Sequence, residues 1–369
     1  MSHDLPDEFG IMLEHLERGR PLALATVVAT SGSVYRRAGA RMLIEPGGVA
    51  IGAVSGGCLE ADLQERALRF ATNPEPQVVE YDGLAADGMP WGLGLGCNGR
   101  VAVVLQPLQE RDRAWVELLC AARSARRPAA LATVFGGSAL GHGAVLAVDS
   151  QGVAAPAAIA AALGGALQSG LRAVLAAGRT HIARELGATD CSVLLEFLPP
   201  PMQLWIIGAG PDAGPLVAAA CAQGWSVTVS DHRAGQLSAQ RFAGAALQLG
   251  EPEATLPRLR ADARTAVVVM THNYERDRRA LAALAPSAPA YLGVLGPRAR
   301  TDRLLQELTA AGVRLEAARG ALHAPVGLAL GAETPEEIAV AIVAEIIARF
   351  RGGHGGSLRD RSEPIHAAD

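Results

Sequence analysis

Gln203-Leu-Trp-Ile-Ile-Gly-Ala-Gly-Pro-Asp-Ala213 identifies the fold class of this 369-residue chain more clearly than any other segment. Its first five residues form a short apolar run that is typical of a buried parallel strand. The strand leads directly into a G-x-G-x-x-A turn, and the Ala-rich residues 214–223 that follow predict a helix. A strand, a glycine turn and a helix in this order are typical of the start of a Rossmann-like βαβ unit.

A second predicted strand, over residues 225–230, ends at Asp231, about twenty positions after the second glycine of the turn. In such units the glycines let the backbone approach a diphosphate at the helix N-terminus, and the acid reaches a ribose hydroxyl. Arg233 adds a cation for a phosphate, whereas Pro211 removes one backbone donor. The alternative is a turn whose glycines serve only the backbone. The candidate nucleotide-binding residues are Gly208, Gly210, Asp231 and Arg233.

Residues 265–270 predict another buried strand, whose carboxyl end leads into His272. Ligands of open α/β sheets bind at the carboxyl ends of the strands, so His272 and Asp277 are candidate acid–base residues. An ordinary structural role competes with this assignment for a single histidine. Residues 291–300 repeat the order of strand, glycine and cation, which adds two candidate cofactor-binding residues, Gly293 and Arg298.

Three consecutive prolines, Pro199–Pro201, mark the clearest boundary, because they cannot continue a helix or a central strand. We therefore expect an N-terminal domain over residues 1–198 and a doubly wound parallel sheet of the Rossmann type over residues 202–350. The sequence Thr334-Pro-Glu-Glu337 predicts the capped start of the last helix. The polar, glycine-rich tail, residues 351–369, is expected to be disordered.

Two stretches of the N-terminal domain look alike, residues 25–49 and residues 132–153. Each reads as strand, glycine-rich link, strand, tight turn and strand, followed by a helix. This pattern predicts an α/β domain with an internal duplication. The two copies differ in chemistry. The first carries Ser55-Gly-Gly-Cys-Leu-Glu60 at its strand-to-helix turn and is followed by the glycine-rich stretch 92–99, which contains Cys97, whereas the second has an apolar run at the corresponding place.

Composition excludes several classes of function. The chain has no lysine, so neither a Walker-type phosphate loop nor a Schiff-base enzyme is open to it. A formal net charge of -4 with 19% charged residues leaves no basic surplus for nucleic acid. The apolar stretches end well before a membrane-spanning length, and the acidic, amphipathic start is unlike a signal peptide. We therefore expect a cytoplasmic protein without a membrane span.

The five cysteines form no C-x-x-C pair, which argues against a disulfide framework and against a structural zinc site. Cys58 and Cys97 lie in glycine-rich turns, and a helix dipole favours a thiolate at a helix start, which is the position of Cys58. The competing interpretation is a small buried hydrophobe, the usual state of a free cysteine. The remaining three, which lie in apolar runs and are predicted to be structural, are Cys120, Cys191 and Cys221.

Together these motifs resemble the XdhC/CoxI family of accessory factors for xanthine dehydrogenase and carbon monoxide dehydrogenase, over about residues 10–350. The motifs that carry the resemblance are Gly32-Ser33, Gly39-Ala-Arg-Met42, Ser55–Glu60, Gly94–Cys97, Gly208-Ala-Gly210, Thr271-His272, Gly293, Gly296 and Thr334–Ile338. The chain departs from the family's pattern at Asn98, where glycine is frequent, and at Asn273, where aspartate usually follows Thr-His. The second departure removes a charge and weakens a general-base role for position 273.

The resemblance implies a non-catalytic accessory protein that binds molybdenum cofactor, in its plain or nucleotide-extended form, protects it during sulfuration and delivers it to a xanthine dehydrogenase-type molybdenum hydroxylase. It also implies a cysteine desulfurase-type sulfur donor and a homodimer. Molybdenum is a soft metal, so the thiolates of Cys97 and Cys58 are its candidate ligands. The other candidate cofactor-binding residues of these loops are Gly57, Glu60 and Gly96.

Two alternatives come from other functional classes. The first is an NAD(P)-dependent oxidoreductase acting on a small molecule, with the nicotinamide cofactor on the glycine turn and His272 as acid or base. The second is a scaffold that recruits a sulfurtransferase and a hydroxylase without touching the cofactor. The scaffold hypothesis leaves the glycine–cysteine loops unexplained.

Limited proteolysis should cut the chain near Pro199–Pro201 and release a C-terminal fragment that stays folded, because connectors between domains are exposed and make few contacts. Mass spectrometry would locate the cut, and circular dichroism of the purified fragment would show whether it keeps its helices and strands. A cut at the prolines that leaves only unfolded C-terminal peptides would show that the boundary is wrong.

Overall fold

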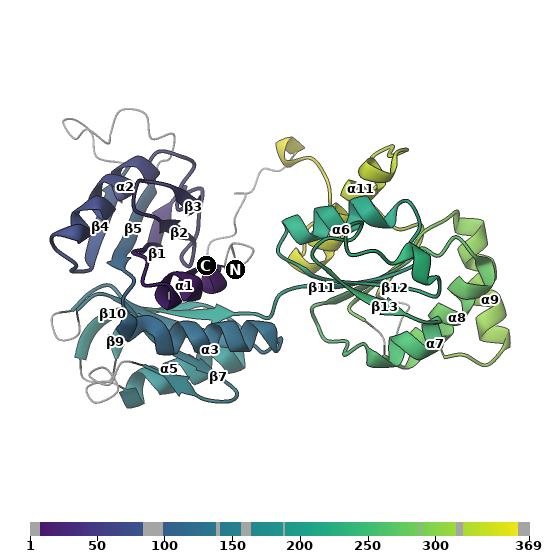
Figure 1. Ribbon diagram of the computed structural model, residues 1–369, viewed down its shortest axis with the longest axis horizontal. Coiled ribbons are helices and arrows are strands. Elements are labelled where there is room, and N and C mark those ends of the chain that lie inside the picture. Colours follow the sequence, from purple (N-terminus) through teal and green to yellow (C-terminus); the bar gives the residue numbers. More distant parts are fainter. Residues whose placement is uncertain are drawn as a thin grey trace. The chain divides into compact units, whose positions relative to one another are not determined.

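The computed structural model describes residues 8–83, 99–137, 141–155, 164–186, 189–287, 289–314 and 320–360. By its internal contacts the chain separates into two compact units, Met1–Pro200 and Pro201–Asp369, so the division falls within the proline run. Each unit is built on its own β-sheets (Figure 1).

The described residues of the N-terminal unit form two five-stranded antiparallel sheets with the same strand order. The first sheet has the order β3 (Ala50–Gly52), β2 (Arg41–Ile44), β1 (Ala23–Gly32), β5 (Gly99–Pro107) and β4 (Gln77–Asp82). The second has the order β8 (Val153–Ala154), β7 (Gly143–Asp149), β6 (Ala129–Val134), β10 (Thr189–Leu198) and β9 (His181–Leu186). The predicted α/β fold with an internal duplication is confirmed as a repeated topology.

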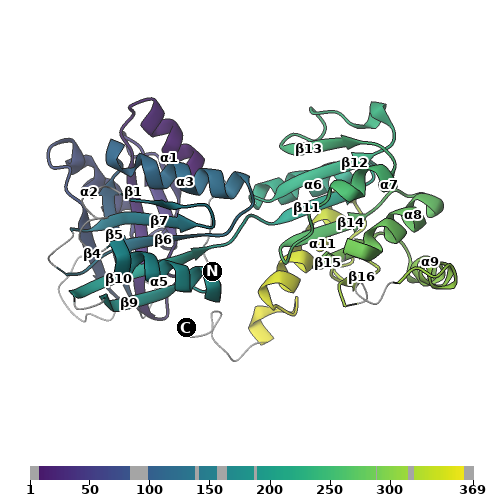
Figure 2. The same cartoon turned by 90° about the horizontal axis from the view of Figure 1, so that it is seen from below.

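The helices of this unit repeat in the same way. Helices α1 (Glu8–Glu17) and α3 (Arg113–Ser124) precede the first strand of each copy, and α2 (Glu60–Leu68) and α5 (Gly164–Ala177) follow the third. Each of α2 and α5 packs its apolar residues on one face of its own sheet. Helices α1 and α3 lie next to each other (Figure 2) and share a core with both sheets, in which Trp115 is fully buried.

A pair of glycines shows that the two copies also contact each other in a matching way. Gly39 lies two residues before β2 and Gly143 is the first residue of β7, and both have positive φ, 95° and 122°. A Cβ atom built on Gly39 would lie 2.7 Å from Oε1 of Glu196 in the last strand of the other copy. A Cβ atom on Gly143 would lie 3.1 Å from Oε1 of Gln106, again in the other copy's last strand. Glycine is favoured at both positions, because other residues rarely adopt a positive φ and a side chain would press on the polar group.

A buried ion cluster joins the two copies. The guanidinium of Arg41 in β2 contacts Glu8 of α1, with 3.1 Å between Nη1 and Oε1, and both carboxylate oxygens of Glu196 in β10. The side chains of all three residues are 1% exposed. Arg41 also donates to the carbonyl of Gly39 over 3.3 Å, so the guanidinium fixes the end of the link that enters β2.

In the C-terminal unit the described residues form a six-stranded parallel sheet. Its order is β13 (Ala245–Leu249), β12 (Ser226–Asp231), β11 (Gln203–Ile207), β14 (Thr265–Val269), β15 (Tyr291–Val294) and β16 (Leu322–His323). Helices α6 (Ala213–Ala222) and α11 (Pro335–Arg351) cover one face, and α7 (Pro252–Thr255), α8 (Tyr274–Leu284) and α9 (Arg298–Ala310) cover the other (Figures 1 and 2). The strand order is that of a Rossmann fold, as predicted, with the switch point between β11 and β14.

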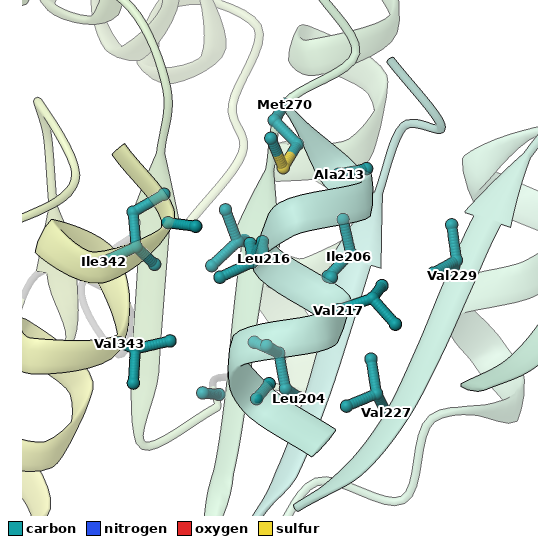
Figure 3. Close-up of a cluster of buried hydrophobic side chains, with 14 of the residues drawn as sticks. Leu204, Ile206, Ala213, Leu216, Val217, Val227, Val229, Met270, Ile342 and Val343 are labelled. Atoms are coloured by element: carbon teal, nitrogen blue, oxygen red, sulfur yellow. The ribbon is translucent and has the colours of Figure 1, made fainter. Parts of the chain in front are cut away.

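The apolar run that opens the unit is buried on both faces of this sheet. Leu204 and Ile206 point toward α6, where Leu216 and Val217 meet them together with residues of α11 (Figure 3). The alternate residues, Trp205 and Ile207, pack on the opposite face. A central parallel strand has helices on both sides, which is why its sequence shows no alternation of apolar and polar residues.

Helix α11 begins and ends where its sequence predicts. Thr334 accepts a hydrogen bond from the backbone of Glu337 while the Glu337 carboxylate accepts from the backbone of Thr334, and Pro335 occupies the first turn. Gly352, with φ of 68°, ends the helix. Of the tail predicted to be disordered over residues 351–369, Arg351 is the last residue of α11 and Leu358–Asp360 form an exposed 3-10 helix. Residues 361–369 lie outside the described part. None of the helices among the described residues has the length and apolar character needed to span a bilayer.

Replacing Arg41 by Met should lower the free energy of unfolding of the N-terminal unit by about 3–5 kcal/mol, because two carboxylates would remain buried without their guanidinium. Urea denaturation of the full-length protein measures the change. The matched control is Arg69→Met, which breaks an exposed pair with Glu65 and should cost less than about 1 kcal/mol. Equal costs for the two variants would mean that the buried cluster contributes nothing beyond a surface pair.

Candidate functional site

The glycine turn after β11 is forced by the close approach of β14. Gly208 has φ of 118°, and a Cβ atom there would lie 2.6 Å from the backbone oxygen of Met270. No other residue fits at this position without moving one of the two strands. A Cβ atom on Gly210 would lie 3.1 Å from the imidazole of His272. Close packing against Met270 and His272 therefore explains both glycines without a ligand.

Asp231 ends β12 directly beside this turn and is 5% exposed. Its carboxylate accepts hydrogen bonds from the backbone N–H of Ala209 over 2.8 Å and from the guanidinium of Arg233 over 2.8 and 2.9 Å. Burial alone would raise the pKa of Asp231, but the hydrogen bonds from Arg233 and Ala209 hold it well below its usual range. The predicted residues thus come together, with both oxygens of the acid bonded to the protein's own donors.

A second arginine holds the turn from the other side. Nη1 of Arg241 donates to the carbonyl of Ala209 over 2.9 Å, and Nη2 donates to the carbonyl of Gly210. Arg241 was not among the sequence-based candidates, because it follows the turn by 31 residues and carries no motif. The turn is therefore a rigid element, held by Arg241 on its carbonyls and by Asp231 on its N–H.

The carboxyl end of β14 brings together the two candidate acid–base residues. His272 has φ of 57°, is half exposed, and lies 3.0 Å through Nε2 from Oδ2 of Asp212 at the start of α6. Asp277 is fully buried: Oδ1 accepts from the hydroxyl and the N–H of Thr271, and Oδ2 pairs with Arg300 at 2.7 Å. Only the imidazole is accessible, and the carboxylate of Asp277 fixes the strand end.

The last two candidates of this unit lie apart from each other. Gly293 is inside β15, where a Cβ atom would lie 2.4 Å from Cγ2 of Val326, so its missing side chain makes room for packing. Arg298 is the first residue of α9 and is exposed. The neighbouring Arg300, rather than Arg298, is the cation that reaches the end of β14.

In the N-terminal unit the loop Ser55–Glu60 connects β3 to α2 and is held by its own acid. The carboxylate of Glu60 accepts from the backbone N–H groups of Val54, Ser55 and Leu59 and from the Ser55 hydroxyl. Burial would raise the pKa of Glu60, but the hydrogen bonds from Ser55 and the backbone lower it below its usual value. Gly57, with φ of 115°, permits the turn. Glu60 therefore positions the loop.

Cys58 lies on this loop with its side chain exposed, and its thiol donates to the hydroxyl of Ser55 over 3.5 Å. It lines a hollow that is open to solvent. The hollow is lined by Val34, Tyr35, Arg36, Val54, Ser55, Cys58, Leu59, Tyr81 and Val101. Gly96 and Cys97 lie outside the described residues. Gly99, where the chain re-enters β5, packs against Val34 of the hollow, with 2.6 Å from a built Cβ atom to Cγ1.

The cysteines predicted to be structural are less accessible than Cys58. Cys191 is buried, and Cys120 and Cys221 are half-buried. Within the part of the chain that the structure describes, no group of three histidine, cysteine or acidic side chains is placed to hold a metal ion. A soft metal at Cys58 would thus have to bring further ligands of its own.

Asp231→Asn should lower the free energy of unfolding by roughly 2–3 kcal/mol at pH 7, because charged hydrogen bonds to Arg233 and Ala209 are lost. The folded-state pKa of Asp231 lies below the unfolded-state value of about 3.9, so the carboxylate stabilises the fold at neutral pH and this contribution declines as the pH falls below about 4. Urea denaturation at pH 7 and near pH 3.5 should show the gap between wild type and variant closing. The exposed Asp302→Asn serves as control, with an expected effect within about 0.5 kcal/mol.

Comparison with known proteins places both units in one family. The sequence model described as the XdhC and CoxI family matches residues 15–82, and the model described as the XdhC Rossmann domain matches residues 204–346. A crystal structure described as a xanthine dehydrogenase from Bacillus halodurans superposes with a TM-score of 0.76 at 28% identity and covers 99% of each chain.

Two curated proteins extend over nearly the whole chain. A protein of Bacillus subtilis named as a probable subunit of xanthine dehydrogenase is 32% identical over 342 residues, which is 92% of this chain and 96% of that protein. The molybdenum cofactor insertion chaperone PaoD of Escherichia coli is 24% identical over 335 residues, 90% of this chain and 85% of that protein. The resemblance inferred from the motifs is confirmed, and this chain belongs to the XdhC and CoxI family.

Proposed function

We propose that this protein is an accessory factor that binds molybdenum cofactor as cargo and delivers it, in sulfurated form, to a xanthine dehydrogenase-type molybdenum hydroxylase. Two relatives support the accessory role for molybdenum enzymes: one is named as a molybdenum cofactor insertion chaperone and the other as a probable subunit of xanthine dehydrogenase. The single structural observation that carries the proposal is the exposed thiol of Cys58 on a preformed loop at an open hollow.

The loop suits a thiol that must reach a metal. Molybdenum in this cofactor is soft, and a thiolate is preferred over the carboxylates that are far more abundant in this chain. Glu60 and Ser55 already satisfy the backbone donors around Cys58, so the loop keeps its shape when the thiol changes partner. A preformed loop lowers the entropy cost of binding. Within this proposal Cys97, two residues before Gly99, is the second thiol.

The partners in this proposal are a molybdenum hydroxylase client and a cysteine desulfurase-type sulfur donor, and the protein acts as a homodimer. Nicotinamide binding has less support from the geometry. A ribose diol would have to displace Arg233 or Ala209 from the carboxylate of Asp231. The experiment below therefore also tests whether the protein binds NAD or NADP.

The test is retention of cofactor. Purified protein is incubated with molybdenum cofactor released from a hydroxylase, and separately with NAD and NADP, and the species that co-elutes is identified. Cys58→Ala should retain at least about tenfold less molybdenum cofactor than wild type, since a direct ligand is lost. Cys97→Ala should behave similarly, and both variants should fail to activate a cofactor-free client.

Cys221→Ala is the matched control, because Cys221 lies in α6, where its half-buried thiol contacts the carbonyl of Ala243 at 3.9 Å. It should retain cofactor as wild type does. Equal retention by wild type and a Cys58/Cys97 double variant would contradict the thiolate proposal. Co-elution of a dinucleotide in place of molybdenum cofactor would support the oxidoreductase alternative.

A further inference from the structure

The hollow beside Cys58 has an apolar floor, and the hydroxyl of Tyr81 at this floor already donates a hydrogen bond within the protein. Val54, Leu59 and Tyr81 are 1%, 3% and 4% exposed and form its inner wall. The Tyr81 hydroxyl donates to Oδ2 of Asp62 over 2.6 Å, and this contact, together with burial, raises the pKa of Tyr81. The floor therefore presents ring and aliphatic carbon rather than a free polar group, so the polar and stacking groups available to a ligand lie around its rim.

Tyr35 stands at the rim of this hollow with 59% of its surface exposed. Its ring lies against Gly56, where a built Cβ atom would be 3.4 Å from Cδ2, so the loop supports the ring on one side. The Tyr35 hydroxyl has no hydrogen-bond partner among the described residues. A large aromatic ring that is backed on one side and otherwise exposed is a surface on which a planar ring can stack.

Arg36 follows directly and also lines the hollow. Its side chain is half-buried, and it forms no hydrogen bond or ion pair with the residues that the structure describes. The buried Arg41, five positions later, shows the contrasting case of a guanidinium with carboxylate partners inside the protein. A half-buried guanidinium without a partner is suited to a phosphate, which it can meet with two parallel hydrogen bonds.

We propose that Tyr35 stacks on the pterin ring of the cargo and that Arg36 binds its terminal phosphate, while Cys58 contacts the metal end. This inference rests on the proposed function, because it takes molybdenum cofactor as the ligand. The three groups of the hollow correspond to the three parts of that molecule: a ring for the planar heterocycle, a guanidinium for the phosphate and a thiol for the soft metal. Recognition of the organic part is then independent of the metal.

The test uses two metal-free probes, the oxidised fluorescent pterin obtained from the cofactor with its phosphate and the same pterin after phosphatase treatment. Fluorescence anisotropy measures their affinity for the full-length protein. Tyr35→Ala should weaken both probes about tenfold, since stacking on one aromatic ring is lost, and Tyr35→Phe should bind as wild type does. Arg36→Gln should weaken only the phosphorylated probe, also about tenfold. Cys58→Ala should leave both affinities unchanged.

Arg69→Gln, at an exposed arginine on the neighbouring 3-10 helix, controls for loss of charge and should change neither affinity. Circular dichroism checks that the variants fold. We expect them to fold, because the side chains of Tyr35 and Arg36 lie at the rim of the hollow and not in the core. Wild type that retains intact cofactor while Tyr35→Ala and Arg36→Gln bind both probes normally would overturn this inference and leave the proposed function standing. Wild type that retains neither cofactor nor probe would overturn both.

Discussion

The N-terminal unit is organised around the guanidinium of Arg41, which is buried between the carboxylates of Glu8 and Glu196. Three charged side chains that are 1% exposed carry a large desolvation cost, which is offset only when their geometry is satisfied. That geometry requires the Arg41 end of β2 in the first copy to contact Glu196 of β10 in the second. We infer that the cluster mainly specifies how the two copies pack, because a misplaced sheet would leave buried charges without partners.

The same guanidinium sets the position of the candidate site. Arg41 begins β2 and donates to the carbonyl of Gly39, so it fixes the far end of the link that leaves β1 at Gly32. Tyr35 and Arg36 lie on this link. Gly39 is also where a side chain would collide with Glu196, which ties the link to the second copy. A duplicated fold thus supplies a rigid frame, and only the first copy carries the cysteine loop against it.

Local patterns predicted the elements well because their causes are local. The apolar run at residues 203–207, the glycine turn and the capping box at Thr334 each specify backbone geometry through neighbouring residues, and all are found as predicted. The pairings that complete the sites are long-range: Arg41 meets Glu196 over 155 positions and Arg241 meets the turn over 31. No periodicity marks such partners, since either charge could pair with many others.

Residue type also proved a poor guide to what a charged group faces. Glu60 and Asp231 were both predicted to bind cofactor, and each carboxylate accepts hydrogen bonds from the loop it stands on or beside. Their chemistry is the one expected, an acid at a glycine-rich turn, but the donors are backbone N–H groups and side chains of the protein. The folded backbone determines whether such a carboxylate accepts its hydrogen bonds from donors of the protein or from donors of a ligand. Tyr35 illustrates the reverse, because a single exposed ring follows no pattern in the sequence.

The two units therefore differ in how many polar groups of their candidate sites are still free to bind a ligand. In the C-terminal unit the acid beside the turn is paired with Arg233 and with the N–H of Ala209, so a ribose hydroxyl there would have to replace existing bonds. A ligand that only replaces bonds gains little, because each lost contact offsets a new one. At the hollow, Arg36 has no partner among the described residues, and the thiol of Cys58 is exposed. A ligand at the hollow would gain contacts with the Arg36 guanidinium and the Cys58 thiol, and among the described residues only the weak hydrogen bond from this thiol to Ser55 would be replaced. This difference favours the N-terminal unit as the place where the cargo is held.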